Sequence, residues 1–163
     1  MTHGRTPRGR ISLLGTLALM AAACGGGGGT AEKTPDGGLP TPEPGQALVI
    51  TPQALARFLE VYVAEESGKG GGWLEVPDPA TGADLRLKLR KVHDQDMVPI
   101  GPDAFSQCAD MGDESGRVYD VDFLVKKTAR GVDVTEVLLH RTPDAARYEW
   151  VEEQPGQWIR KPG

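Results

Sequence analysis

The side chains of this chain that could do chemistry are few, and His93 comes first among them. It lies in the run Val92-His93-Asp94-Gln95-Asp96, where a histidine beside a carboxylate could act as a general base. Neighbouring residues of a strand point to opposite faces, however, so His93 and Asp94 are poorly placed to pair. We therefore expect an exposed polar strand end here, and the same at His140.

A metal site shared by the two histidines is the alternative. It would take Cys108 or a carboxylate as a further ligand, and three strands would have to converge on it. Because no spacing in the sequence predicts that convergence, we expect neither a metal nor a cofactor.

Cys108 is one of two cysteines in the chain. It could form an intermolecular disulfide or act as a redox-sensitive nucleophile. No helix start or basic cluster adjoins it in sequence to lower its pKa. Free cysteine usually behaves as a small buried hydrophobe, so we expect Cys108 to belong to the core.

Five carboxylates flank one expected hairpin: Asp110, Asp113, Glu114, Asp120 and Asp122. A calcium loop would need the Asp-x-Asp-x-Asp-Gly spacing, which is missing. We therefore expect a solvated acidic face.

Aromatic residues near the end of the chain could line a groove for a hydrophobic or glycan ligand. The residues for such a groove are Tyr148, Trp150 and Trp158, with Tyr62 from the expected helix. The alternative is that these side chains only cover a sheet.

The elements that must position these residues begin with a helix of about 16 residues. Thr51-Pro52 is typical of a helix start, with a hydroxyl N-cap followed by proline. An apolar stripe with a 3.6-residue period follows, and residues 67–72 end it in a glycine-rich turn. The stripe consists of Leu55, Phe58, Leu59, Tyr62 and Val63.

After residue 72 the period becomes two, which predicts strands. We expect strands at 73–76, 85–90, 104–111, 118–126, 132–140, 148–152 and 157–159, with hairpin connections. The alternation slips at Thr135-Glu136, which indicates a bulge. One helix covering a curved antiparallel sheet of about five strands defines an α+β domain over residues 48–163.

This order of elements resembles the cystatin-like and NTF2-like folds, in which an N-terminal helix lies in the concavity of a bent sheet. The stretch 104–141 resembles uncharacterised envelope lipoproteins, with Cys-Ala-Asp, Tyr-Asp-Val-Asp-Phe and Val-Thr-Glu-Val. The inhibitory Gln-x-Val-x-Gly motif of cystatins is absent, which argues against protease inhibition.

Residues 1–23 are typical of a secretory signal peptide. Three arginines precede a 13-residue apolar run, Ile11 to Ala23, and small residues lead to Cys24. The end of this run resembles the lipobox of bacterial lipoproteins, although Ala21 stands where leucine is most common. The resemblance implies cleavage before Cys24 and its modification with diacylglycerol and a further acyl chain such as palmitate. The alternative is an ordinary signal peptide cleaved near Ala23.

Residues 24–47 are expected to form a tether after the lipidated cysteine. Glycine and proline supply 12 of the 23 positions from 25 to 47. The segment therefore has too few large apolar side chains to form a core. Gly25 in place of aspartate after Cys24 favours the outer membrane, facing the periplasm, where a cell has two membranes.

Composition excludes some functions. The whole chain has net charge −5, and removal of the three leader arginines leaves 15 basic against 23 acidic residues. That balance argues against a nucleic-acid partner. The absence of a convergent catalytic set favours a lipid-anchored, non-enzymatic binding or interaction module. The alternatives are a small NTF2-like hydrolase or isomerase with a pocket around His93, and an accessory subunit that docks an envelope protein.

Overall fold

The computed structural model describes residues 48–129 and 131–163. The expected signal peptide, the tether and Cys24 lie outside the described residues. Within this part of the chain, none of the helices has the length and apolar character that a membrane span requires.

The helix α1 runs from Pro52 to Lys69. Thr51 is its N-cap, as predicted, and the side-chain oxygen of Thr51 accepts a hydrogen bond from Ala54 N at 3.1 Å. Gly70 is the C-cap, and Gly71 and Gly72 follow with φ of 67° and 90°, values that glycine adopts without steric cost. The helix therefore begins where the sequence indicated, but with 18 residues it is longer than expected, because residues 67–69 are helical and only the glycines that follow form the turn.

Replacing Thr51 with alanine should lower the free energy of unfolding by about 1 kcal/mol, because one N–H of the first helical turn loses its acceptor. Thr51→Ser is the matched control, since serine keeps the hydroxyl and should cost no more than a few tenths of a kcal/mol. Urea unfolding of the two variants measures the difference. Equal losses in both would show that the cap does not stabilise the helix.

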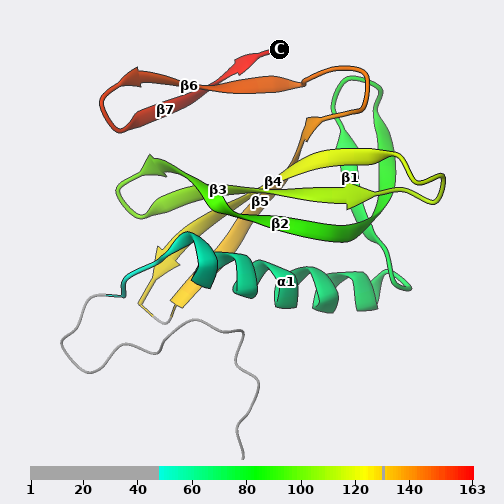
Figure 1. Cartoon of the computed structure of the whole chain (residues 1–163), viewed down its shortest axis with the longest axis horizontal. Coiled ribbons are helices and arrows are strands. Elements are labelled where there is room, and N and C mark those ends of the chain that lie inside the picture. Colours follow the sequence, from blue (N-terminus) through cyan, green and yellow to red (C-terminus); the bar gives the residue numbers. More distant parts are fainter. Residues whose placement is uncertain (1–47, 130) are drawn as a thin grey trace, which may run out of the picture. The chain divides into compact units, whose positions relative to one another are not determined.

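Five strands form an antiparallel sheet in chain order, β1-β2-β3-β4-β5 (Figure 1). Their bounds are Leu74–Asp78, Ala83–Gly101, Ala104–Gly112, Val118–Thr128 and Gly131–Arg141. The 19-residue β2 is longer than the sequence indicated, because it pairs with β1 through its first part and with β3 through the rest. The predicted bulge in β5 is confirmed: Leu124 pairs with Glu136 and Val125 with Val134, so Thr135 is the extra residue.

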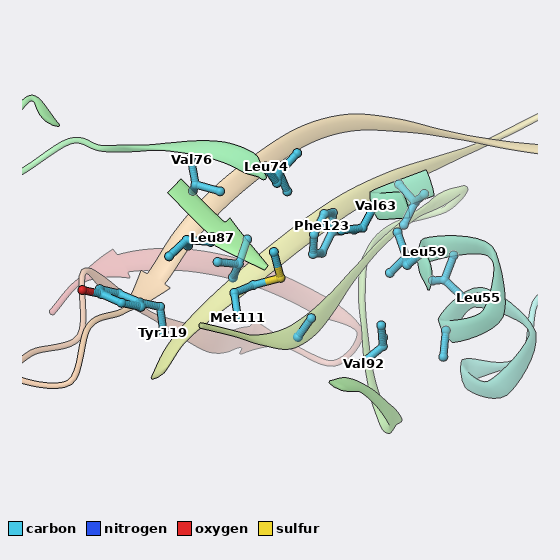
Figure 2. Packing of buried hydrophobic residues seen from close by; sticks show 14 of the residues in the cluster. Leu55, Leu59, Val63, Leu74, Val76, Leu87, Val92, Met111, Tyr119 and Phe123 are labelled. Carbon is cyan, nitrogen blue, oxygen red and sulfur yellow. The ribbon is translucent and has the colours of Figure 1, made fainter. Parts of the chain in front are cut away.

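The hydrophobic core lies between α1 and one face of this sheet, here called the inner face (Figure 2). Leu55, Leu59 and Val63 of the helix are buried against Phe123 and its neighbours, whereas Phe58 and Tyr62 are only partly buried. The alternation along β4 follows the prediction on this face, where Tyr119, Val121, Phe123 and Val125 are all buried.

The last two strands form a sheet of their own rather than extending the first. β6 (Tyr148–Gln154) and β7 (Gln157–Pro162) pair as a hairpin. Side chains of β6 contact Asp122 on the face of the five-stranded sheet opposite α1, here called the outer face. The described part of the chain therefore has three layers, and the outer face is covered in part by the hairpin.

An ion pair ties the connection between β5 and β6 to the end of β1. Arg147 donates to both carboxylate oxygens of Asp78, with Nε to Oδ1 at 2.9 Å and Nη2 to Oδ2 at 2.8 Å. Asp78 is only 4% exposed and also accepts hydrogen bonds from Ala80 N and Thr81 Oγ1. The Arg147 guanidinium in particular lowers the pKa of Asp78 from 3.8 to about 2.

This pair predicts a loss of stability in acid. The folded pKa of Asp78 lies below the unfolded value, so the pair stabilises the fold above about pH 4. That contribution, about 2 kcal/mol, is lost as the pH falls through about 2. Arg147→Met should lower stability at pH 7 and reduce the difference in stability between pH 5 and pH 2.

Urea unfolding at several pH values measures this effect. The matched control is Arg117→Met, because Arg117 pairs with Asp144 at 2.6 Å but both side chains are at least half exposed. Exposed pairs contribute little, so this variant should stay within about 0.5 kcal/mol of the parent. An Arg147→Met protein that keeps the full acid dependence of the parent would contradict the assignment to Asp78.

Candidate functional site

Asp122 is the centre of a group of polar side chains on the outer face. It lies in β4 and is 2% exposed. Tyr148 OH and Trp150 Nε1, both from β6, donate to its Oδ2 at 2.7 Å each. The expectation of a solvated acidic face is wrong at this residue, because the β6–β7 hairpin covers it. Two donors satisfy Oδ2 and leave Oδ1 for another partner.

Cys108 lies directly opposite Asp122 in the pairing of β3 with β4. Its side chain is on the polar outer face and is partly exposed, so the expectation that it belongs to the hydrophobic core is wrong. Burial first, and then the negative charge of Asp122, raise the pKa of the thiol far above its ordinary value. This shift opposes the thiolate form that a cysteine nucleophile needs.

His140 completes a group of three. Asp120 pairs with Arg141 and Val121 with Leu139, which makes His140 the extra residue of a second bulge in β5. Its ring stacks on Tyr148 with centroids 4.8 Å apart, and its Nδ1 lies 3.6 Å from Asp122 Oδ1. The side chain is 17% exposed, so the expectation of an exposed strand end is wrong at His140.

The pKa shifts of Asp122 and His140 follow from this geometry. Burial alone would raise the pKa of Asp122, but its interactions with His140, Tyr148 and Trp150 outweigh burial and lower it. Asp122 in turn raises the pKa of His140 against the opposing effect of burial. Burial and the charge of Asp122 also raise the pKa of Tyr148, which keeps its hydroxyl a donor.

Cys108, Asp122 and His140 line a pocket of about 230 Å³ on the outer face. One ligand atom from each of Cys108, Asp122 and His140 lies within 4.8 Å of the other two. The pocket is lined by His93, Asp96, Val98, Ser106, Cys108, Asp120, Asp122, His140 and Trp150. The shared site considered from the sequence needed both histidines, whereas the group found here joins His140 of β5 to Cys108 of β3 and Asp122 of β4, without His93.

His93 is at the same pocket but belongs to a different pair. It lies within β2 and its side chain is 29% exposed, so the expectation of an exposed strand end is wrong here too. Residues 93–96 of β2 stand opposite Cys108 alone, because Val92 pairs with Ala109 and Met97 with Gln107. This wide bulge lets His93 Nε2 lie 2.8 Å from Asp110 Oδ1, in a neighbouring strand. The hydrogen bonds found among the described residues join His93 to Asp110 and not to Asp94, in agreement with the strand geometry expected from the sequence.

Of the remaining acidic residues of the β3–β4 hairpin, Asp120 is partly exposed and lines the pocket, whereas Asp113 and Glu114 lie at the turn. Asp113 organises the turn, because its Oδ1 accepts from Ser115 N and Arg117 N and its Oδ2 accepts from Tyr119 OH. Glu114 forms an exposed pair with Arg86 at 3.4 Å.

The four aromatic residues expected to form a groove do not share one. Tyr148 and Trp150 meet edge to face on the outer face, with centroids 5.8 Å apart. Trp158 pairs with Glu152 in the β6–β7 hairpin. Tyr62 lies on the other side of the five-stranded sheet, where its ring meets Phe123. Tyr148 and Trp150 instead position Asp122.

Sequence reasoning missed Asp122 as a site residue, although one signal was present. The outward positions of β4 include Leu124, which is 9% exposed. A large apolar residue on an otherwise charged face indicates that another layer covers that face.

In comparisons with family models, with curated proteins and with solved structures, nothing was found that matches this chain. The function must therefore be argued from the N-terminal sequence pattern and from the geometry of the site.

Proposed function

We propose that this protein is a lipid-anchored binding module of a bacterial cell envelope, which takes a small ligand in the outer-face pocket. The observation that carries the binding part is the pocket itself. The pocket is lined by the thiol of Cys108, the ring of His140 and the carboxylate of Asp122. Tyr148 and Trp150 hold that buried carboxylate in place with two hydrogen bonds. The location rests on the lipobox-like sequence that ends at Cys24.

The state of the pocket residues favours binding over catalysis. Burial and the charge of Asp122 raise the pKa of the Cys108 thiol, which opposes its use as a nucleophile. Oδ2 of Asp122 is already occupied by two hydrogen bonds. Such fixed polar groups in a partly open pocket orient a ligand.

Filling the pocket tests this proposal. Val98 lines the pocket, so Val98→Trp should obstruct it, while Val118→Trp places the same side chain at an exposed position of β4. Native mass spectrometry of protein extracted from its own envelope in mild detergent should show a bound ligand in the parent and in Val118→Trp. The ligand should be lost in Val98→Trp. Absence of any bound mass in the parent, or its retention in Val98→Trp, would reject the pocket as the binding site.

The His93–Asp110 contact supports a second candidate, a small hydrolase or isomerase. A histidine 2.8 Å from a carboxylate at the wall of a pocket can serve as a general base. Hydrolysis of a panel of simple esters by the parent should then be abolished in His93→Ala and in Asp110→Asn. Asp94→Ala is the matched control and should keep the activity, because no contact joins the Asp94 carboxylate to His93 among the described hydrogen bonds.

We also propose that the domain is related to the cystatin-like or NTF2-like folds. The order of one helix followed by an antiparallel meander, with the helix packed on the inner face, supports this relation. The separate β6–β7 hairpin on the outer face is an addition to that plan. An experimental structure in which α1 packs on the face of the sheet that carries Cys108 and Asp122 would contradict it.

A further inference from the structure

We propose that Cys108, Asp122 and His140 bind a transition-metal ion of the zinc type at the base of the outer-face pocket. This inference rests on the proposed function, because it names the ligand of the same pocket. A thiolate, an imidazole and a carboxylate are the three kinds of ligand that protein zinc sites use. Hard cations such as calcium and magnesium prefer oxygen ligands alone, so this set discriminates against them.

The spacing of the ligand atoms is close to what one ion requires. Zinc bonds to nitrogen, oxygen and sulfur measure about 2.0–2.3 Å, so two ligands of a tetrahedral ion are about 3.3–3.6 Å apart. His140 Nδ1 and Asp122 Oδ1 are already 3.6 Å apart. All three ligand atoms lie within 4.8 Å of one another, so small side-chain rotations bring them onto one ion.

The ring nitrogens of His140 are also available to coordinate, which is an observation separate from the spacing of the three ligand atoms. Both ring nitrogens of His140 are inaccessible to solvent and make no hydrogen bond within the described part of the chain. Buried polar atoms are rarely left without a partner, and a metal ion would supply one. A metal at Nδ1 would lie on the Asp122 side of the ring, where the pair already meets.

The surroundings of Asp122 match the outer shell of a metal site. Ligating carboxylates are commonly held by further hydrogen bonds, which fix the orientation of the coordinating oxygen. Tyr148 and Trp150 both donate to Oδ2 and so direct Oδ1 towards His140 and Cys108. The stacking of Tyr148 on the His140 ring fixes the second ligand as well.

Three protein ligands leave the fourth position of a tetrahedral ion open towards the pocket, where water or a ligand group can coordinate. Binding replaces the proton of the Cys108 thiol by the metal and releases that proton to solvent, with no change of oxidation state. His93 is held by Asp110 and is not counted among the ligands.

The test uses the full chain with Cys24→Ser, so that Cys108 is its one thiol. Cobalt(II) is the spectroscopic probe, and zinc is then titrated against it. We expect one cobalt per chain with a thiolate-to-cobalt charge-transfer band, displaced by one equivalent of zinc and unaffected by magnesium. Cys108→Ser should abolish the band, and His140→Gln should weaken zinc binding at least tenfold. Asp94→Asn is the matched control, because Asp94 is a nearby carboxylate outside the three ligands and outside the lining of this pocket, and it should change the affinity less than threefold.

A second measurement needs no substitution among the three ligands, so its result does not depend on whether a variant folds. Zinc should slow alkylation of Cys108 by iodoacetamide at least tenfold in the Cys24→Ser chain, whereas magnesium should not. No stoichiometric cobalt uptake, a charge-transfer band that persists in Cys108→Ser, or equal alkylation rates with and without zinc would each overturn the metal site. An organic ligand found in the pocket by mass spectrometry together with such a result would leave the proposed binding function standing.

Discussion

Asp122→Ala is expected to lower the free energy of unfolding by about 3 kcal/mol, measured in the presence of a chelator. The carboxylate accepts hydrogen bonds from Tyr148 OH and Trp150 Nε1 at 2.7 Å and is 2% exposed. A buried donor left without an acceptor costs about 1–3 kcal/mol, and this change leaves two of them. Small domains have only about 5–15 kcal/mol of stability in total, so the effect is large.

Two further variants separate hydrogen bonding from charge. Asp122→Asn keeps a carbonyl oxygen that both donors can reach, so it should recover most of the loss. Asp120→Ala removes a partly exposed carboxylate of the same strand, which meets Arg141 at only 3.7 Å, and should cost less than about 1 kcal/mol. The chelator keeps any bound metal from contributing to the comparison.

Hydrogen exchange can also show which part of the domain Asp122→Ala destabilises. Because the two donors belong to β6, hydrogen exchange in Asp122→Ala should accelerate most in the β6–β7 hairpin, while α1 stays protected. If stability is unchanged, or if exchange rises equally throughout the domain, then Asp122 does not hold the hairpin against the outer face.

The elements of this fold that depend on local sequence were predictable. Thr51 and Pro52 start α1, and the stripe through Leu55 and Leu59 identifies its buried side, because caps and periodicity act within a few residues. Each hairpin of the meander is likewise formed by neighbours in sequence, so the α+β class follows from the order of the elements alone.

The site was not predictable in the same way, because it depends on strand register. The bulges at His140 and at residues 93–96 are defined by which partner residues face each other across the sheet. A shift of one residue would turn His140 to the inner face. Alternation within a single strand does not contain that information, and so it predicted an exposed histidine and a solvated Asp122.

The place of the hairpin is the other long-range feature. The sequence of β6 and β7 is compatible with two more strands of one sheet, and nothing local indicates a separate layer. The layer is specified by pairs far apart in the chain, Arg147 with Asp78 and Tyr148 with Asp122. Those pairs bury the polar groups that now form the site.

Cys24→Ser is expected to move the protein almost completely from the membrane fraction to the soluble fraction. The leader resembles a lipoprotein signal that ends at Cys24. Each buried methylene of an acyl chain contributes about 0.8 kcal/mol, so two or three chains give stable anchoring where a single one does not. Without them, a chain with 15 basic and 23 acidic residues after the leader has no net attraction to anionic lipid.

Fractionation of cells fed a labelled fatty acid measures both parts of this prediction, partition and covalent label. Cys108→Ser is the matched control, because it removes the other cysteine of the chain and should leave the label and the membrane fraction unchanged. Label retained in Cys24→Ser would show that another residue carries the lipid. Loss of label with unchanged membrane partition would show that a protein partner, rather than an acyl chain, holds the domain at the membrane. Only release together with loss of label supports the anchor, because either result alone has another physical cause.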